Sequence, residues 1–258
     1  MTTSPPAEQP SLNVLPELQQ HFDAERVTGT IALLDTANAE LLCSDVTRCQ
    51  RAVIPASTFK VPHALIALEL SVLEDSESAM PWDGQERAIP EWNRDHTLRS
   101  AMQVSCVPCF QAVARRIGAA RMRDWLVRLD YGNQAISGGI DRFWLTGGLR
   151  VSPLEQIDFL RRLDQGTLPV KPKSLDVVRD VMTLDVGFDH VFRGKTGWAA
   201  PGDADREYGW FAGWVELGER RVYFALLIDG HAPDVDIRPV RRRLAERILR
   251  ARNILPAS

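Results

Sequence analysis

Two residues that could act together chemically, Ser57 and Lys60, stand in the segment IPASTFKVP. A spacing of three residues puts them on one face of a helix, so the lysine amine can reach the serine hydroxyl and activate it as a nucleophile. The positive N-terminal end of a helix would also favour negative charge that develops at Ser57. The same residues could equally be a capping serine beside a solvated lysine, so this pair needs support from elsewhere in the chain.

A second motif, Lys195, Thr196 and Gly197 followed by Trp198, lies in a predicted strand. Its lysine and threonine offer a cation and a hydroxyl to a substrate carboxylate, and Gly197 lets a ligand approach the backbone closely. S-x-x-K and K-T-G together are typical of penicillin-binding proteins and class A β-lactamases. The combination therefore favours acyl transfer through a serine nucleophile.

Four further motifs resemble those of the class D β-lactamases, or oxacillinases, more than those of class A. In chain order they are S-x-V (Ser105, Cys106, Val107), Y-G-N (Tyr131, Gly132, Asn133), F-W-L (Phe143, Trp144, Leu145) and G-W-x-x-G-W-V-E (209–216). The similarity runs from about Ala32 to the NIL segment at residues 253–255. The resemblance implies hydrolysis of a β-lactam, a small-molecule substrate, through an acyl-enzyme.

The resemblance also implies a role for the lysine of the first motif. Lys60 would react with CO2 to give N6-carboxylysine, a carbamate that serves as general base while Ser57 is acylated and deacylated; no other cofactor is expected. Carboxylation requires a neutral amine, and Val107, Trp144 and Leu145 are suited to form the apolar pocket that lowers the lysine pKa. The Trp144 indole N–H would then hold the carbamate.

The remaining roles follow from the same resemblance. Ser105 would pass a proton to the lactam nitrogen under the influence of Lys195, and the backbone N–H groups of Ser57 and Trp198 would form the oxyanion hole. Thr196, Gly197, Trp198 and Tyr131 would bind substrate, although Tyr131 could instead simply belong to a turn that ends a helix. The substrate carboxylate would bind an arginine of the last helix. Counting back from residues 253–255 selects Arg241, and the neighbouring arginines leave this register open: Arg238, Arg242 and Arg243.

The four cysteines form two local pairs. The resemblance implies a disulfide between Cys43 and Cys49, which flank a polar SDVTR stretch, in an oxidising compartment. We interpret Cys106 and Cys109, a C-x-x-C pair, as packing residues of a helix; a redox site or a zinc site shared with the other pair is less favoured. The five histidines form no metal-binding motif, so we expect surface or hydrogen-bonded histidines and no metal.

The elements that must position these residues predict an α+β fold, in which both chain ends form one antiparallel sheet with flanking helices and a mostly helical region is inserted. A capping box at Ser152 and Glu155, with Pro153 in the first turn, starts one helix. Some irregularity is expected near Ser57, because Pro62 falls late for a first-turn proline. The other predicted elements are a helix over 16–26, a buried strand over 27–35, a helix after Ser57, helical structure over 98–129 with a break near Gly118 and a stop at Gly132, strands from His190 with a hairpin at the GER turn, and a last helix over 240–253.

Length and composition fit a single domain over residues 1–258, with a sheet region of about 16–60 and 185–258, a helical region of about 61–184, and disorder in about the first ten residues. A net charge of −3 argues against nucleic acid as a partner. No apolar stretch approaches the roughly 20 residues that span a bilayer. A homodimer is compatible with the sequence, which does not predict the oligomeric state.

The start MTTSPPAEQP lacks the basic and apolar segments of a signal peptide, which leaves a processed form or a protein that is never exported. The resemblance favours a periplasmic or secreted enzyme after signal removal. The competing function is a β-lactam sensor or transpeptidase, which is acylated at the same serine but keeps the acyl group or transfers it. Such sensors are usually tethered to a membrane, and Trp144 with Val107 favours the hydrolase.

Overall fold

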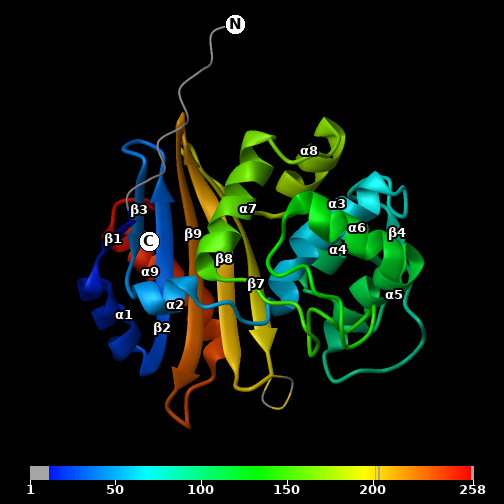
Figure 1. Cartoon of the computed structure of the whole chain (residues 1–258), viewed down its shortest axis with the longest axis horizontal. Helices are drawn as coiled ribbons and strands as arrows, with labels where there is room; N and C mark the ends of the chain where they lie inside the picture. Colours follow the sequence, from blue (N-terminus) through cyan, green and yellow to red (C-terminus); the bar gives the residue numbers. More distant parts are fainter. Residues whose placement is uncertain (1–11, 201, 203, 257–258) are drawn as a thin grey trace, which may run out of the picture.

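The computed structural model describes residues 12–200, 202 and 204–256, so the disorder predicted for about the first ten residues lies outside the described part. Its centre is a seven-stranded sheet (Figure 1) in the order β1-β3-β2-β9-β8-β7-β6. The strands are β1 (Leu12–Val14), β2 (Val27–Asp35), β3 (Glu40–Cys43), β6 (Thr183–Val186), β7 (Val191–Ala199), β8 (Tyr208–Leu217) and β9 (Arg220–His231).

The two ends of the chain meet at the β2–β9 pair, which runs antiparallel from Val27 opposite His231 to Asp35 opposite Val222. The predicted α+β fold with a sheet shared by both chain ends is therefore confirmed. The sheet departs from purely antiparallel pairing at one edge, because β1 runs parallel to β3. β2 has the predicted bounds, since its apolar, β-branched residues suit a strand covered on both faces.

Apolar layers cover both faces of the sheet, because successive strand residues point to opposite sides. On β9, Phe224 and Leu226 pack in one layer with helix α9 (Ile237–Ala251), while Ala225 and Leu227 pack in the layer on the other face. Helix α7 (Pro153–Gln165) lies on that second face against β9, β2 and β8. Figure 1 shows α7 between the sheet and the other helices of the inserted region.

The inserted region carries the helices that reach the candidate site. None of the described helices is long and apolar enough to cross a membrane. The remaining elements are η1 (Pro16–Leu18), α1 (Gln19–Ala24), α2 (Val46–Gln50), η2 (Ala56–Phe59), α3 (Lys60–Glu69), β4 (Ala79–Met80), η3 (Pro90–Trp92), β5 (His96–Thr97), α4 (Leu98–Gln103), α5 (Val107–Ile117), α6 (Ala119–Leu129) and α8 (Pro172–Val181).

Helix boundaries confirm some predictions and correct others. The capping box at Ser152 starts α7 as predicted, with the hydroxyl accepting from the Glu155 N–H. The predicted break at Gly118 separates α5 from α6, and a second break, not predicted, separates α4 from α5 at Ser105. The predicted helical end at Leu129 is confirmed, and the residue that ends α6 is Asp130, which adopts the left-handed conformation with φ 46°, rather than Gly132.

Candidate active site

Ser57 and Lys60 lie where a tight 3-10 turn, η2, runs into α3. The Lys60 Nζ donates a hydrogen bond to the Ser57 Oγ at 2.7 Å. Lys60 is fully buried, and this burial lowers its pKa to about 7, because a charged ammonium loses its hydration in an apolar interior. A large fraction of the amine is therefore neutral near pH 7, in contact with a potential nucleophile.

The strand β7 packs directly on the serine turn, and Gly197 permits that approach. A Cβ atom at Gly197 would lie 2.9 Å from the Pro55 carbonyl oxygen and 3.1 Å from both the Thr58 methyl and the Trp210 Cβ. Trp210 also donates from its indole to the Ile54 carbonyl at 2.9 Å. Gly197 was predicted to let a ligand approach the backbone. In the structure its lack of a side chain lets the serine turn pack against β7.

A second lysine–serine pair faces the first. The Lys195 Nζ donates to the Ser105 Oγ at 2.9 Å and to the Thr196 carbonyl at 3.0 Å. Burial lowers the pKa of Lys195, and the positive charges of Lys60 and Arg241 lower it further. Ser105 has φ 55°, a left-handed backbone that is costly for a residue with a side chain. Ser105 lies at the break between α4 and α5, and this strained backbone conformation directs its hydroxyl toward Lys195.

A buried cluster of rings lies beside Lys60. It is called here the aromatic cluster and is made up of Phe59, His63, Phe110, Phe143 and Trp144. The Lys60 Nζ lies 5.4 Å from the centre of the Phe110 ring. Trp144 is fully buried, and its Nε1 has no hydrogen-bond partner among the described residues. Val107 lies half-buried in the first turn of α5.

Two members of the aromatic cluster were missed from the sequence. Phe110 follows Val107 by three residues on α5, so the helical spacing could have indicated it. His63 follows Lys60 by three residues on α3 in the same way. Histidines were expected to be exposed or hydrogen-bonded, yet His63 is fully buried and neither ring nitrogen has a partner within the described part of the chain. That expectation is wrong for His63.

Tyr131 packs behind the serine turn. Its ring is buried, with centroids 5.7 Å from Phe59 and 5.0 Å from Phe159. Its hydroxyl donates to the Gln156 Oε1 at 3.4 Å, and the Gln156 amide donates to the Thr58 Oγ1 at 2.7 Å. The predicted substrate contact of Tyr131 is therefore corrected to a structural role, because its polar group is used to support the turn that carries Ser57.

The register of the candidate carboxylate-binding arginine is resolved by the partners of each guanidinium. Arg241 donates a hydrogen bond to the K-T-G strand, at the Gly197 carbonyl, over 2.6 Å. Burial lowers its pKa to about 10. The three neighbours are all paired with carboxylates: Arg238 with Asp236, Arg242 with Glu246 and Arg243 with Glu25. The choice of Arg241 is thus supported by geometry.

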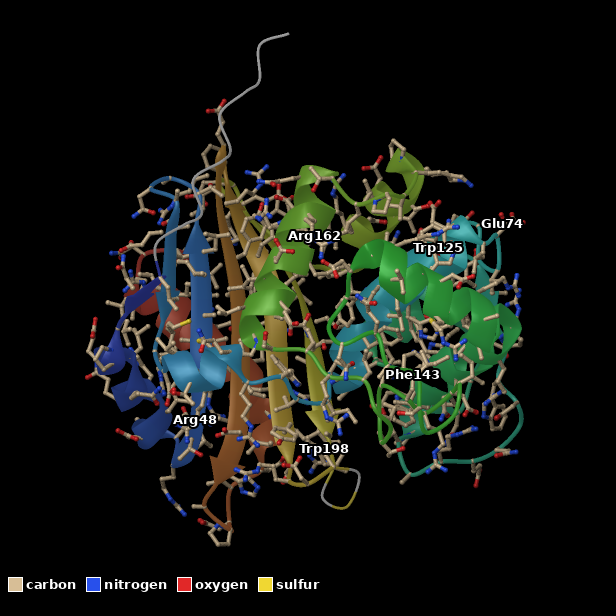
Figure 2. The ribbon with its side chains drawn as sticks, viewed as in Figure 1. Arg48, Glu74, Trp125, Phe143, Arg162 and Trp198 are labelled. Carbon is tan, nitrogen blue, oxygen red and sulfur yellow. A yellow bond between two sulfur atoms is a disulfide. The ribbon has the colours of Figure 1, made fainter. Side chains whose placement is uncertain are left out.

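The side chain of Trp198 is used for contacts away from Ser57. Figure 2 shows it at the lower end of β7. Its indole donates to the Glu207 Oε1 at 2.6 Å, and the Arg238 guanidinium stacks on its ring at 5.2 Å. These contacts do not support the predicted binding of substrate by the Trp198 side chain.

Thr196, two residues earlier, lines a small cavity of about 90 Å³ with Lys195 and Arg242.

The disulfide assignment is corrected. Cys106 and Cys109 are joined by a disulfide, with Cα atoms 5.5 Å apart, while Cys43 and Cys49 are free buried thiols. A C-x-x-C pair at the start of α5 brings its sulfurs together within one helical turn, which satisfies disulfide geometry. The Cys49 sulfur lies 3.2 Å from the Thr30 hydroxyl. The interpretation of Cys106 and Cys109 as mere packing residues is therefore wrong.

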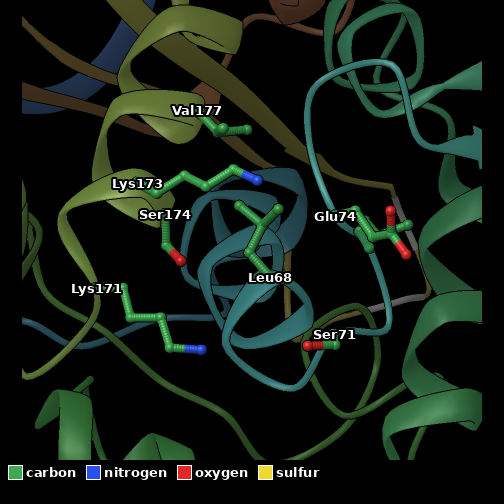
Figure 3. Close-up of a pocket in the computed structure, with 8 residues that line it drawn as sticks. Leu68, Ser71, Glu74, Lys171, Lys173, Ser174 and Val177 are labelled. Carbon is green, nitrogen blue, oxygen red and sulfur yellow. The ribbon is translucent and has the colours of Figure 1, made fainter.

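A larger cavity, of about 280 Å³, lies between α3 and α8 (Figure 3). It begins near Leu68, two turns further along α3 than Lys60. Glu69 occupies the start of α8 by accepting from the Lys171 N–H at 2.9 Å and the Ser174 hydroxyl at 2.5 Å. One of the two serines that line this cavity, Ser174, is thereby hydrogen-bonded to a carboxylate and not to a lysine.

The site thus brings together two lysine–serine pairs, Lys60 with Ser57 and Lys195 with Ser105, and the comparisons with known proteins show the family to which the chain belongs. Residues 21–250 match the penicillin-binding protein transpeptidase domain. The chain is 40% identical to β-lactamase OXA-48 of Klebsiella pneumoniae and 35% identical to β-lactamase OXA-10 of Pseudomonas aeruginosa, in both cases over 92% of this chain and 88% of the relative.

Solved structures narrow the family further. The class D β-lactamase YbXI from Nostoc superposes with a TM-score of 0.87 at 36% identity, covering 92% of this chain and 99% of that one. The class D β-lactamase from Sebaldella termitidis gives a TM-score of 0.90 at 31% identity, covering 95% and 99%. The chain belongs to the class D β-lactamases, as its motifs predicted.

Proposed function

We propose that this enzyme hydrolyses the β-lactam ring through an acyl-enzyme on Ser57, with N-carboxylated Lys60 as the general base in both half-reactions, and so confers antibiotic resistance. The observation that carries the proposal is the 2.7 Å contact between the Lys60 Nζ and the Ser57 Oγ inside a fully buried pocket. Membership of the class D family supplies the substrate class.

Carboxylation of Lys60 fits the chemistry of its pocket. The neutral amine attacks CO2, the N–C bond forms, one C=O electron pair moves onto oxygen, and the proton displaced from Nζ passes to water. A pKa of about 7 makes the neutral amine available. The carbamate carries negative charge on oxygen, and the Trp144 Nε1, a buried donor otherwise without a partner in the described structure, suits such an acceptor.

The acylation half-reaction then uses the two pairs in turn. The base removes the Ser57 proton, the Oγ attacks the lactam carbonyl carbon, and the ring C–N bond breaks. Ser105 gives its proton to the departing nitrogen, and Lys195, whose pKa is lowered, replaces it. Backbone N–H groups of Ser57 and Trp198 stabilise the oxyanion. Thr196 and Arg241 bind the substrate carboxylate.

After acylation the proton that the base took from Ser57 passes to Lys195, which had reprotonated Ser105, so the base is again free to accept a proton. In the second half-reaction it takes a proton from water, whose oxygen attacks the acyl carbon. The ester bond to Ser57 breaks and the proton returns to its Oγ. Buried aromatic rings around Lys60 keep the surroundings of the base apolar, which strengthens its interaction with a proton donor.

Nitrocefin hydrolysis tests the proposed function. We expect continuous turnover, abolished in Ser57→Ala and raised by bicarbonate. A burst equal to the enzyme concentration with no steady state would instead indicate a sensor or transpeptidase. The Ser57 adduct, followed by intact-mass spectrometry, should appear and then decay.

Cellular location and oligomeric state are further proposals. A periplasmic or secreted location is supported by the Cys106–Cys109 disulfide, since disulfides persist in oxidising compartments; cell fractionation tests it. A homodimer stays a prediction. The exposed apolar residues Val186 and Phe188 lie beside the sheet edge. If two copies associate there, the variant Phe188→Ser should have a lower sedimentation coefficient than the native protein.

A further inference from the structure

His63 is a fully buried polar side chain beside the proposed base. It lies one turn after Lys60 on α3. Its ring packs against the rings of Phe59, Phe110 and Trp144, with centroids 5.6, 5.3 and 5.3 Å away. Because Phe110 also covers the Lys60 Nζ, the imidazole and the amine share one enclosure.

Two polar groups of this enclosure have no hydrogen-bond partner in the described structure: the Trp144 indole and the His63 ring, at both of its nitrogens. Buried polar groups are almost always paired, and an exception calls for an explanation. A neutral imidazole carries one N–H donor, and an indole carries another. The pocket thus holds two unused donors near one amine.

We propose that His63 is a positioning residue that donates its ring N–H to the carboxylated head of Lys60, as a second anchor alongside Trp144. A carbamate adds two oxygens to the amine, and each needs donors when it is buried. Two donors on neighbouring aromatic residues match two oxygens. The inference rests on the proposed carboxylation of Lys60 and adds a residue to it.

The protonation state of His63 suits this role. Burial and, to a smaller extent, the positive charge of Lys60 together lower its pKa to about 3. The ring is therefore neutral at physiological pH. It adds no second positive charge that would disfavour carboxylation, and it does not compete for the displaced proton.

The test measures the carbamate itself. Protein freed of CO2 is titrated with ¹³C-labelled bicarbonate, and the carbamate carbon is followed by NMR, with unfolding temperature measured in parallel. The variant His63→Leu replaces the imidazole by an apolar side chain of similar size. We expect its half-saturation to need about tenfold more bicarbonate, because a hydrogen bond to a charged group is lost. Without bicarbonate its unfolding temperature should equal or exceed that of the native protein.

Matched variants separate anchoring from packing. His63→Asn and His63→Gln each keep one N–H donor, placed near Nδ1 and Nε2 respectively, and at least one should restore the native titration. His190→Leu removes another buried histidine, hydrogen-bonded to Asp185 at 2.9 Å near the sheet edge, and should leave the titration unchanged.

Two results overturn the inference and are distinguishable. If the native protein gives no carbamate signal, the proposed base fails and His63 loses its partner. If the native protein is carboxylated but His63→Leu titrates identically, carboxylation stands and His63 does not anchor it, as would also be found if a buried water satisfies the ring.

Discussion

Replacing the buried lysine by an apolar residue should stabilise this protein at neutral pH. Lys60 has its pKa lowered from 10.5 to about 7 by burial. Above pH 10.5 the amine is neutral in both folded and unfolded chains and costs nothing. Between about 7 and 10.5 only the unfolded chain binds the proton, so the cost to folding grows as the pH falls, and below about 7 it is complete.

The magnitude follows from the size of that shift. At 1.36 kcal/mol per pKa unit, the cost at pH 7 is about 4 kcal/mol and at pH 10 about 1 kcal/mol. Lys60→Met keeps a long flexible side chain and loses the bond to Ser57, worth about 1 kcal/mol. We therefore expect Lys60→Met to be more stable by about 3 kcal/mol at pH 7 and nearly equal to the native chain at pH 10.

Urea unfolding of both proteins in CO2-free buffer between pH 7 and pH 10 measures this difference. Relief of the repulsion between Lys60 and Lys195, which lowers the Lys195 pKa, acts in the same direction. Added bicarbonate should stabilise the native protein but not the variant, because it binds only where the amine is present. A destabilised Lys60→Met at pH 7, or a difference that does not change with pH, would refute the reasoning.

Further predictions concern the supports of the site. Gly197→Ala should lower kcat by at least about tenfold with little loss of secondary structure, because the new Cβ must push β7 from the serine turn, where the Pro55 oxygen lies 2.9 Å away; an unchanged kcat would contradict that contact. Trp144→Phe should raise the bicarbonate needed for half-maximal nitrocefin turnover by about tenfold, since only the N–H is removed; titration at fixed substrate measures it. Thiol counting in denaturant without reductant should find two free thiols per chain, matching the two free cysteines, and four would disprove the disulfide. Changing Cys106 and Cys109 together to Ser should lower the unfolding free energy by about 2 kcal/mol in urea, an effect that a dithiol should reproduce in the native protein.

The strained backbone at Ser105 and the disulfide that begins at the next residue occupy the same short segment. A covalent link across the first turn of α5 limits how far the break between α4 and α5 can relax. The disulfide therefore restrains the backbone segment that keeps the Ser105 hydroxyl in contact with the Lys195 amine.

Local patterns in the sequence were sufficient for several elements. The capping box at Ser152 predicted the start of α7, and the apolar run from Val27 predicted β2, because caps and strand composition act within a few neighbouring residues. The order of the short motifs along the chain was sufficient to predict the family. The spacing within a motif is also informative: residues three apart on a helix are neighbours, so the contact of Ser57 with Lys60 could be predicted.

Tertiary structure decided what depends on residues distant in the chain. Phe110 covers Lys60 only because α5 packs against α3. Arg241 is distinguished from its neighbours by its hydrogen bond to the Gly197 carbonyl of β7. Sequence determined the reactive groups through short-range spacing, whereas their burial, and hence their pKa values, required the packing of the whole molecule.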